Sequence, residues 1–170
     1  MQRTSLLDEA LEAWRYTRTG VIREVENLSG ADLAYRPHPE GRTAAEIAFH
    51  VVESGLMMAG ELSRPDGSFR RKSFPQFIKE YAGHLRATTK KADIVRLLKR
   101  TQAEGGRKIR AAGELHMLQQ ITQFDGERST RLAWMNHGVS HEEYHRGQLA
   151  LYARLCGRTP ALTQLIYGKS

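Results

Sequence analysis

The chain has 170 residues, of which 40% are hydrophobic, and a formal net charge of +7. This length and composition exclude a disordered chain and predict a single domain over residues 1–170, with its core at about 5–160. No stretch approaches the roughly 18 apolar residues of a membrane span, and Met1–Leu11 lacks the apolar segment of a signal peptide. The single cysteine, Cys156, excludes an internal disulfide and favours a cytoplasmic location.

The positive charge is unevenly spread along the chain. Residues 86–110 carry nine Lys or Arg residues against only Asp93 and Glu104. Such a segment suits nucleic acid, an anionic small molecule or an acidic partner. No aromatic residues alternate with the basic ones, so nucleic-acid binding is not expected.

The first predicted element is a helix from Ser5 to Leu28, with Ser5 and Asp8 as a capping box. Its inward line is apolar except at Arg18; the line reads Leu7, Leu11, Trp14, Arg18, Val21, Val25 and Leu28. By default we expect Arg18 to extend its charge outward into water. The alternative is that its guanidinium meets an anionic ligand inside the bundle.

A loop over residues 29–42 leads to the second predicted helix, which the capping box Thr43–Glu46 starts and which reaches about Leu62. Its inward line is Ile47, Val51, Gly55 and Met58, and His50 lies beside that line. After a loop over residues 63–72, Ser73 caps a shorter predicted helix that extends to about Arg86.

The rest of the chain predicts two further long helices, over about 90–112 and from Ser129 or Thr130 to about Cys156. Gly105-Gly106 weakens the first of them, so we expect a close helix contact or a kink there. Residues 115–124 form a short helical or extended connection, closed by a turn at Asp125-Gly126. Four long amphipathic patterns without a convincing strand predict an all-α four-helix bundle.

The last long helix carries two histidines four residues apart, which places them on one face. The predicted inward line of this helix is Trp134, Gly138, His141, His145, Gln148, Tyr152 and Leu155. Three neighbouring polar positions on such a line need partners, because an unpaired buried polar group costs roughly 1–3 kcal/mol. A divalent metal is the simplest partner. Hydrogen-bonded core histidines or a solvated groove are the alternatives, and two histidines do not complete a metal site.

The same segment matches the H-E-x-x-H pattern of zinc proteases, in which the glutamate is the general base. The elongated form of that motif needs a glycine and a histidine where this chain has Gln148 and Leu151. Other forms take a later carboxylate ligand, and residues 146–170 contain no Asp, Glu or His. A protease of this type is therefore not expected.

A third ligand has to come from upstream. His38 lies between two prolines in a loop, and His84 and His116 lie near the ends of predicted secondary-structure elements. His137 lies one turn before His141 but off the inward line. His50 is the histidine in the middle of a separate amphipathic helix. Placed opposite His141 and His145, it gives three imidazoles with an open fourth position, the arrangement of a catalytic or substrate-binding metal.

Three motifs carry a resemblance to a known family: Glu46-Ile-Ala-Phe-His50, His141-Glu-Glu-Tyr-His145-Arg-Gly-Gln148, and Tyr35-Arg36-Pro37. Over roughly residues 5–160 the chain resembles the DinB-like (DinB/YfiT-like) metalloenzymes. The resemblance implies an up-down-down-up four-helix bundle and a homodimer. It also implies a divalent metal (zinc, nickel or iron) held by His50, His141 and His145. One departure is Arg42-Thr43, where many members have Trp-Ser.

Relatives in that family include transferases that use low-molecular-weight thiols, such as bacillithiol or mycothiol, and a maleylpyruvate isomerase. The resemblance therefore implies a metal-dependent enzyme, a thiol-dependent transferase or a hydrolase, acting on a small molecule that the sequence does not identify. The alternative is a non-catalytic, metal-stabilised bundle that acts as a binding or stress protein. Near the histidines, we expect Gln148 to orient a ligand, Arg146 to pair with a neighbouring helix or subunit, and Gly147 to admit a close helix.

Overall fold

The computed structural model describes residues 4–168, which form eight helices and one two-stranded sheet. The elements are α1 (Leu6–Asn27), α2 (Gly30–Leu33), α3 (Ala44–Ser63), α4 (Phe74–Ala82), α5 (Lys91–Ala112), α6 (Glu114–Met117), β1 (Gln120–Thr122), β2 (Arg128–Thr130), α7 (Arg131–Leu155) and α8 (Ala161–Tyr167). Among these residues, none of the helices has the length and apolar content needed to cross a membrane.

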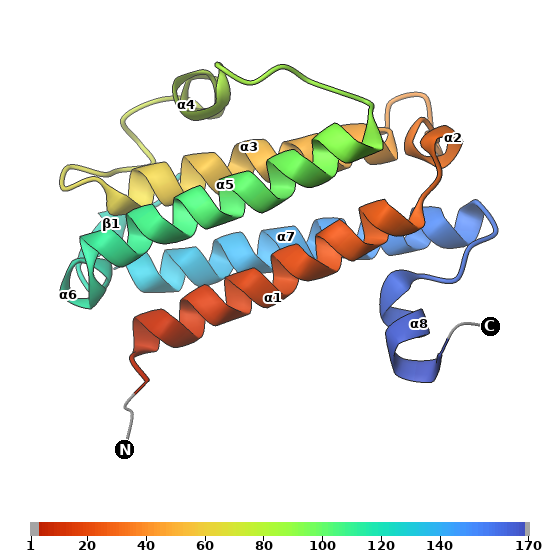
Figure 1. The fold of residues 1–170 in the computed structure, drawn as a ribbon. Helices are drawn as coiled ribbons and strands as arrows, with labels where there is room; N and C mark the ends of the chain where they lie inside the picture. Colours follow the sequence, from red (N-terminus) through yellow and green to blue (C-terminus); the bar gives the residue numbers. More distant parts are fainter. Residues whose placement is uncertain (1–3, 169–170) are drawn as a thin grey trace.

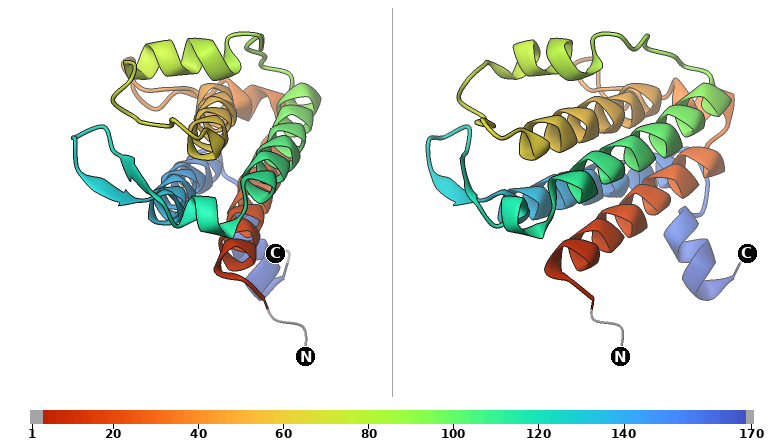
Figure 2. Two further views of the ribbon diagram at one scale, coloured as in Figure 1. Left: turned by 90° about the vertical axis from the view of Figure 1, so that its left-hand side faces the viewer. Right: turned by 60° about the vertical axis from the view of Figure 1, so that its left-hand side comes forward.

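The four long helices form an up-down-down-up bundle, which confirms the predicted fold class (Figure 1). Helices α1 and α7 run in one direction, and α3 and α5 run in the other (Figures 1 and 2). Around the bundle, α3 packs against α5 and α7, and α1 packs against the same two helices. Because α3 and α5 are parallel, the chain has to return along the bundle between them. Residues 64–90 make this return and carry α4, which packs on α3.

The predicted helix starts are observed. The Ser5 side chain accepts a hydrogen bond from the Asp8 amide, and that of Thr130 from the Ala133 amide. Thr43 and Glu46 form the reciprocal capping box of α3. Helix α4, however, ends at Ala82 rather than at about residue 86. Gly83 follows directly, and glycine costs about 1 kcal/mol in a helix interior, so the pattern does not extend the helix beyond it.

The connection from α5 to α7 contains a strand pair that the sequence pattern did not indicate. After α6, β1 and β2 pair antiparallel with Ile121 opposite Ser129. The predicted turn lies between them, and Gly126 has a φ of +98°, a left-handed conformation that favours glycine. Three-residue strands are too short to display a reliable alternation of polar and apolar residues, which explains why the pattern was ambiguous.

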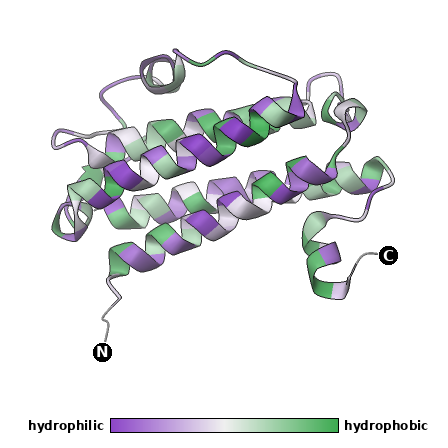
Figure 3. Cartoon of the chain, viewed as in Figure 1, coloured by the Kyte–Doolittle hydropathy of each residue, from purple (hydrophilic) through white to green (hydrophobic). Residues whose placement is uncertain are grey.

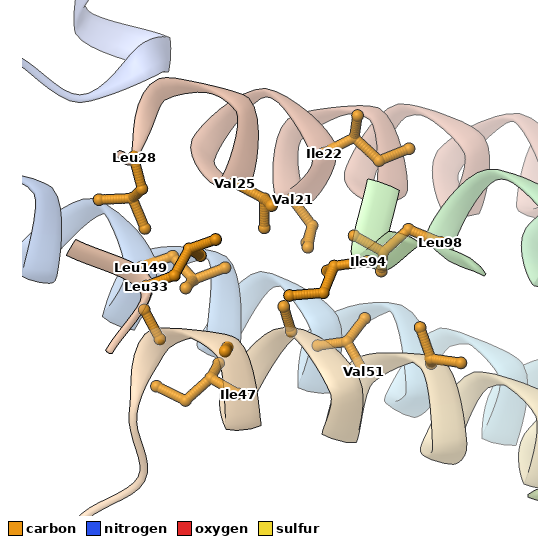
Figure 4. Packing of buried hydrophobic residues seen from close by; sticks show 14 of the residues in the cluster. Val21, Ile22, Val25, Leu28, Leu33, Ile47, Val51, Ile94, Leu98 and Leu149 are labelled. Atoms are coloured by element: carbon orange, nitrogen blue, oxygen red, sulfur yellow. The ribbon is translucent and has the colours of Figure 1, made fainter. Parts of the chain in front are cut away.

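The core lies between the four long helices, along each of which hydrophobic and hydrophilic residues alternate (Figure 3). One half of the core contains residues from all four helices that point toward one another (Figure 4). They include Val21, Val25, Leu28, Ile47, Val51, Ile94, Leu98 and Leu149. A second apolar cluster fills the half near the start of α1 and includes Trp14, Met57, Met58, Leu62, Phe69, Phe77, Ile109 and Met135.

Gly105 confirms the predicted close helix contact. A Cβ at this position would lie 2.6 Å from the Trp14 ring and 2.8 Å from the Ala59 side chain. Its neighbour Gly106 has open space around it. Only the first glycine is therefore needed for the approach of α5 to α1 and α3.

Candidate metal centre

Helices α3 and α7 bring His50, His141 and His145 together inside the bundle. The Nε2 atom of His141 lies 3.1 Å from Nε2 of His145 and 3.3 Å from Nε2 of His50. One ring nitrogen from each histidine lies within 4.8 Å of the other two. The rings meet nearly edge to face, at interplanar angles of 70° to 84°. This is the set of histidines predicted from the sequence, and its role as a ligand set stays a prediction.

The separation of these nitrogens fits a shared cation. Two ligands at about 2.0–2.1 Å from a tetrahedral metal lie about 3.4 Å apart. Hydrogen bonding explains the cluster less well, because both short contacts use the same Nε2 atom of His141. That atom of a neutral imidazole has either one proton or one lone pair, so it pairs with one neighbour at a time.

Gln148 fixes the orientation of one of the three rings. The Nδ1–H group of His145 donates a hydrogen bond to Gln148 Oε1 over 2.7 Å. Nε2 of His145 is then the unprotonated nitrogen, and its lone pair faces the other two rings. The predicted orienting role of Gln148 agrees with this contact.

The environment of the three rings keeps them uncharged at neutral pH. Burial, reinforced by the charge of Arg42 and by the other two rings, lowers the pKa of His50 to about 3. Burial likewise lowers the pKa of His141 and of His145. Neutral imidazole is the form that binds a metal, so no proton has to be displaced near pH 7.

Behind the histidines lies a buried ion pair between α1 and α7. Arg18 donates to both carboxylate oxygens of Glu142, at 2.5 Å and 2.8 Å, and Trp14 Nε1 donates to the same carboxylate at 2.7 Å. The expectation that Arg18 extends into water was wrong, because only 1% of this residue is exposed. The anion that it meets is a side chain of the protein. The partners are far apart in sequence, and a charged residue on an otherwise apolar line was the only signal.

Both oxygens of Glu142 are hydrogen-bonded to these donors, which agrees with the expectation that the chain is not a zinc protease. Its two oxygens accept three hydrogen bonds, and Arg18 also donates to the backbone carbonyl of Leu98. A general base needs an oxygen free to take a proton from substrate or water. The carboxylate instead joins α7 to α1.

The inward line predicted for α7 agrees only in part with the observed buried face: His145 and Tyr152 are buried, but the face as a whole is rotated. The fully buried positions include Met135, Glu142, Leu149 and Ala153, whereas His141 is half-buried and Leu155 is 54% exposed. Helix α7 packs against α1 as well as α3, so its buried face points between these two neighbours. The polar line that contains the histidines lies to one side of this face.

The expectation for Gly147 was wrong; for Arg146, an ion pair with another helix of this chain is not observed among residues 4–168, and one with a partner subunit stays a prediction. Within the described residues, no side chain or backbone of another helix lies within 4 Å of where a Cβ of Gly147 would be. Arg146 pairs with Glu143 of its own helix, at 3.1 Å, and its guanidinium lies over the ring of Tyr16. The close approach to α1 is made by Gly20 instead, where a Cβ would meet the Arg146 side chain.

The remaining histidines lie outside the cluster. Nε2 of His116 lies 2.9 Å from the carbonyl oxygen of Leu62, and the ring of His137 lies against Trp134. His38 and His84 are exposed. Within residues 4–168, the three predicted histidines are therefore the group positioned to share a metal.

Two spaces of different character adjoin the histidines. On the side of His141 lies a cavity of about 250 Å³, lined mainly by aromatic and methionine side chains. On the side of His50 lies an open groove of about 790 Å³ that contains Arg42, Glu53 and Lys90. Sequence patterns did not indicate either space, because residues from several connections form the walls.

Comparison with known proteins gives a match over nearly the whole chain. The model of the DinB family matches residues 1–169. No curated protein matches the chain.

Solved structures share the architecture at low sequence identity. A DinB-like protein of Bacillus subtilis, YjoA, superposes with a TM-score of 0.68 at 18% identity, over 89% of this chain and 94% of its own. YfiT of Bacillus subtilis, described as a probable metal-dependent hydrolase with an unusual four-helix bundle topology, has a TM-score of 0.68 at 15% identity, over 94% of both chains. A mycothiol-dependent maleylpyruvate isomerase has a TM-score of 0.67 at 14% identity, over 86% of this chain and 63% of its own. At these identities the likeness establishes the fold.

Proposed function

The chain belongs to the DinB family, and from this premise we propose that it is a divalent-metal-dependent enzyme, a hydrolase or a thiol-dependent transferase. The observation that carries the proposal is the convergence of three neutral imidazoles beside a cavity and a groove. A closed structural site has four protein ligands, whereas a catalytic site keeps a position for water or substrate.

His50, His141 and His145 would hold the metal, and three imidazoles suit zinc, nickel and iron alike. When bound, such a cation polarises a carbonyl group and lowers the pKa of a bound water or thiol. The protein contributes positioning. Gln148 holds the ring of His145, and the Arg18–Glu142 pair holds α7 in register with α1.

One relative supports metal-dependent hydrolysis, and another supports the use of a thiol. YfiT is described as a probable metal-dependent hydrolase, and the isomerase is described as mycothiol-dependent. A low-molecular-weight thiol that carries carboxylates would suit the groove on the His50 side, where Arg42 and Lys90 supply positive charge. Glu53 lines the same groove, and burial raises the pKa of its carboxyl group, which favours a role in proton transfer.

Metal analysis of the purified protein tests the proposal directly. We expect one equivalent of divalent metal, and we expect His50→Ala to weaken zinc binding by about tenfold or more. His84→Ala is the matched control, because this exposed histidine lies outside the cluster. Absence of bound metal, or equal zinc affinity in both variants, would refute the metal site.

Turnover then separates the reaction classes. The metal-loaded protein should either hydrolyse 4-nitrophenyl acetate or join cysteine to 1-chloro-2,4-dinitrobenzene, and His50→Ala should lose that activity.

A non-catalytic, metal-stabilised bundle is the second candidate. The observation that favours it is Glu142, whose carboxylate beside the histidines is held by three hydrogen bonds from Arg18 and Trp14. In that case metal removal should lower the melting temperature, and neither reaction should exceed the rate given by His50→Ala.

A further inference from the structure

The cavity beside His141 has walls made largely of aromatic rings. Four rings line it together with two methionines: Phe69, Phe74, Phe124, Trp134, Met57 and Met58. The centroid of Phe69 lies 5.0 Å from that of Phe124 and 5.3 Å from that of Trp134, and both pairs of rings are tilted by 47°. Such spacing and tilt are those of favourable aromatic contacts, so the wall is packed, and a guest ring could extend the same pattern.

Two polar side chains that line the cavity, Ser54 and Glu142, are already hydrogen-bonded to the protein. The other polar atoms of the wall belong to the rings of Trp134, His137 and His141. The Ser54 hydroxyl donates to the His50 carbonyl oxygen over 2.8 Å. Both oxygens of Glu142 accept from Arg18, and Oε1 also accepts from Trp14. At Ser54 and Glu142 a charged or strongly polar guest would lose its water without gaining a free partner, which is costly. An apolar guest has no such penalty.

The cavity is large enough for a ring and has exposed rings among its walls. An apolar cavity of about 150 Å³ is sufficient to bind benzene, and this one measures about 250 Å³. Phe74 and Phe124 line it and yet are 41% and 40% exposed. Large aromatic side chains that stay exposed at the wall of a cavity are typical of a binding site.

The position of the cavity connects it to the histidines. Phe69 and Phe74 belong to the 64–90 connection, Phe124 to the turn of the hairpin, and Trp134 to the first turns of α7. His141 lines the same space and belongs to the cluster of three histidines. A guest ring in the cavity would thus have its polar end near the candidate metal position.

We propose that this cavity binds an uncharged aromatic ring of the substrate, while a polar group on that ring faces the three histidines. The placement of the polar group rests on the proposed function; the binding of the ring does not. The alternative is that these rings only pack against one another as a small hydrophobic core beneath the two connections. The experiments below distinguish the two possibilities.

The first experiment uses the metal-free protein, so that it does not depend on the metal site. Toluene is titrated into protein with ¹³C-labelled methionine methyl groups. The methyl signals of Met57 and Met58 should shift, because a guest ring beside them changes their magnetic environment. Met117 and Met135 are buried and do not line the cavity, so their signals should stay in place. Unchanged Met57 and Met58 signals would overturn the proposal.

The second experiment uses the zinc-loaded protein and two chelating probes, benzohydroxamic acid and acetohydroxamic acid. They share the metal-binding group and differ in the ring. We expect benzohydroxamic acid to bind at least about tenfold more tightly, as burial of an apolar ring predicts. Phe124→Ala should remove most of this preference and leave acetohydroxamic acid unaffected. Phe74→Ala, at a second exposed ring, provides an independent variant.

Phe49→Ala is the matched control, because Phe49 lines the groove on the opposite, His50 side. It should leave the preference intact. Equal binding of the two probes, or loss of the preference in Phe49→Ala rather than in Phe124→Ala, would overturn the assignment of the ring to this cavity. Failure of zinc to bind would refute the proposed function, while the toluene titration would still decide about the cavity.

Discussion

The three histidines and the aromatic cavity meet at His141, yet different parts of the chain build them. The histidines lie on α3 and α7, two long helices with buried faces and defined caps. Most cavity rings lie on the connections at 64–90 and 113–130. Packing of the four-helix bundle therefore sets the positions of the candidate metal ligands. The connections set the shape of the cavity beside those ligands. We therefore expect that the candidate metal centre and the shape of the cavity can change independently.

The largest expected loss of stability comes from breaking the ion pair between helices α1 and α7. Arg18→Met leaves the buried Glu142 carboxylate without its cation, and breaking a buried pair in this way costs about 3–5 kcal/mol. Urea denaturation should show this loss in the free energy of unfolding. The double variant Arg18→Met/Glu142→Gln removes the uncompensated charge and keeps an acceptor for Trp14, so it should recover much of the loss. A single variant with nearly wild-type stability would contradict the structural role of the pair.

Smaller changes in stability are expected when two adjacent glycines of α5 are replaced by alanine. Gly105→Ala places a methyl group against Trp14 and Ala59, and such overpacking costs typically about 1–3 kcal/mol. Gly106→Ala meets open space and gains helix propensity, so it should stabilise the protein by up to about 1 kcal/mol. Thermal unfolding of the two variants should shift in opposite directions. A shift in the same direction would mean that the close approach of α5 is not rigid.

The smallest loss of stability should come from a substitution in the 64–90 connection. Tyr81 of α4 donates to the buried Glu61 of α3 over 2.7 Å, and Arg71 pairs with the same carboxylate. Because Arg71 stays bonded to the carboxylate, Tyr81→Phe should cost about 1.5 kcal/mol, the low end for a hydrogen bond to a charged group, as measured by urea denaturation, and should leave zinc affinity unchanged. Tyr167→Phe, at a ring that is 83% exposed, is the control. A loss of zinc affinity in Tyr81→Phe would show that the connection and the histidines are coupled.

The features that follow local rules could be predicted from the sequence. The caps at Ser5, Thr43 and Thr130 depend on residues within one turn, and the histidine pair depends on the helical period. The choice of His50 required only that it lie in the middle of another amphipathic helix. These observations, with the family resemblance, gave the fold and the three histidines.

The features that depend on distant residues could not be predicted. Arg18 and Glu142 belong to separate helices, and nothing local to Arg18 indicates a buried carboxylate. The orientation of α7 depends on its packing against both α1 and α3, which periodicity alone does not reveal. Phe69 and Phe124 lie in irregular segments, where no period reports on burial. The cavity became evident only from the folded arrangement.

The parallel arrangement of α3 and α5 has a consequence for the length of chain between them. A helix of 20 residues, such as α3, is about 30 Å long, and roughly nine extended residues can span that distance. The 64–90 segment is far longer than this minimum. Most of its residues are therefore not needed to connect α3 to α5. Insertions, deletions or substitutions in this segment can alter which molecules enter the cavity while the four-helix bundle stays the same.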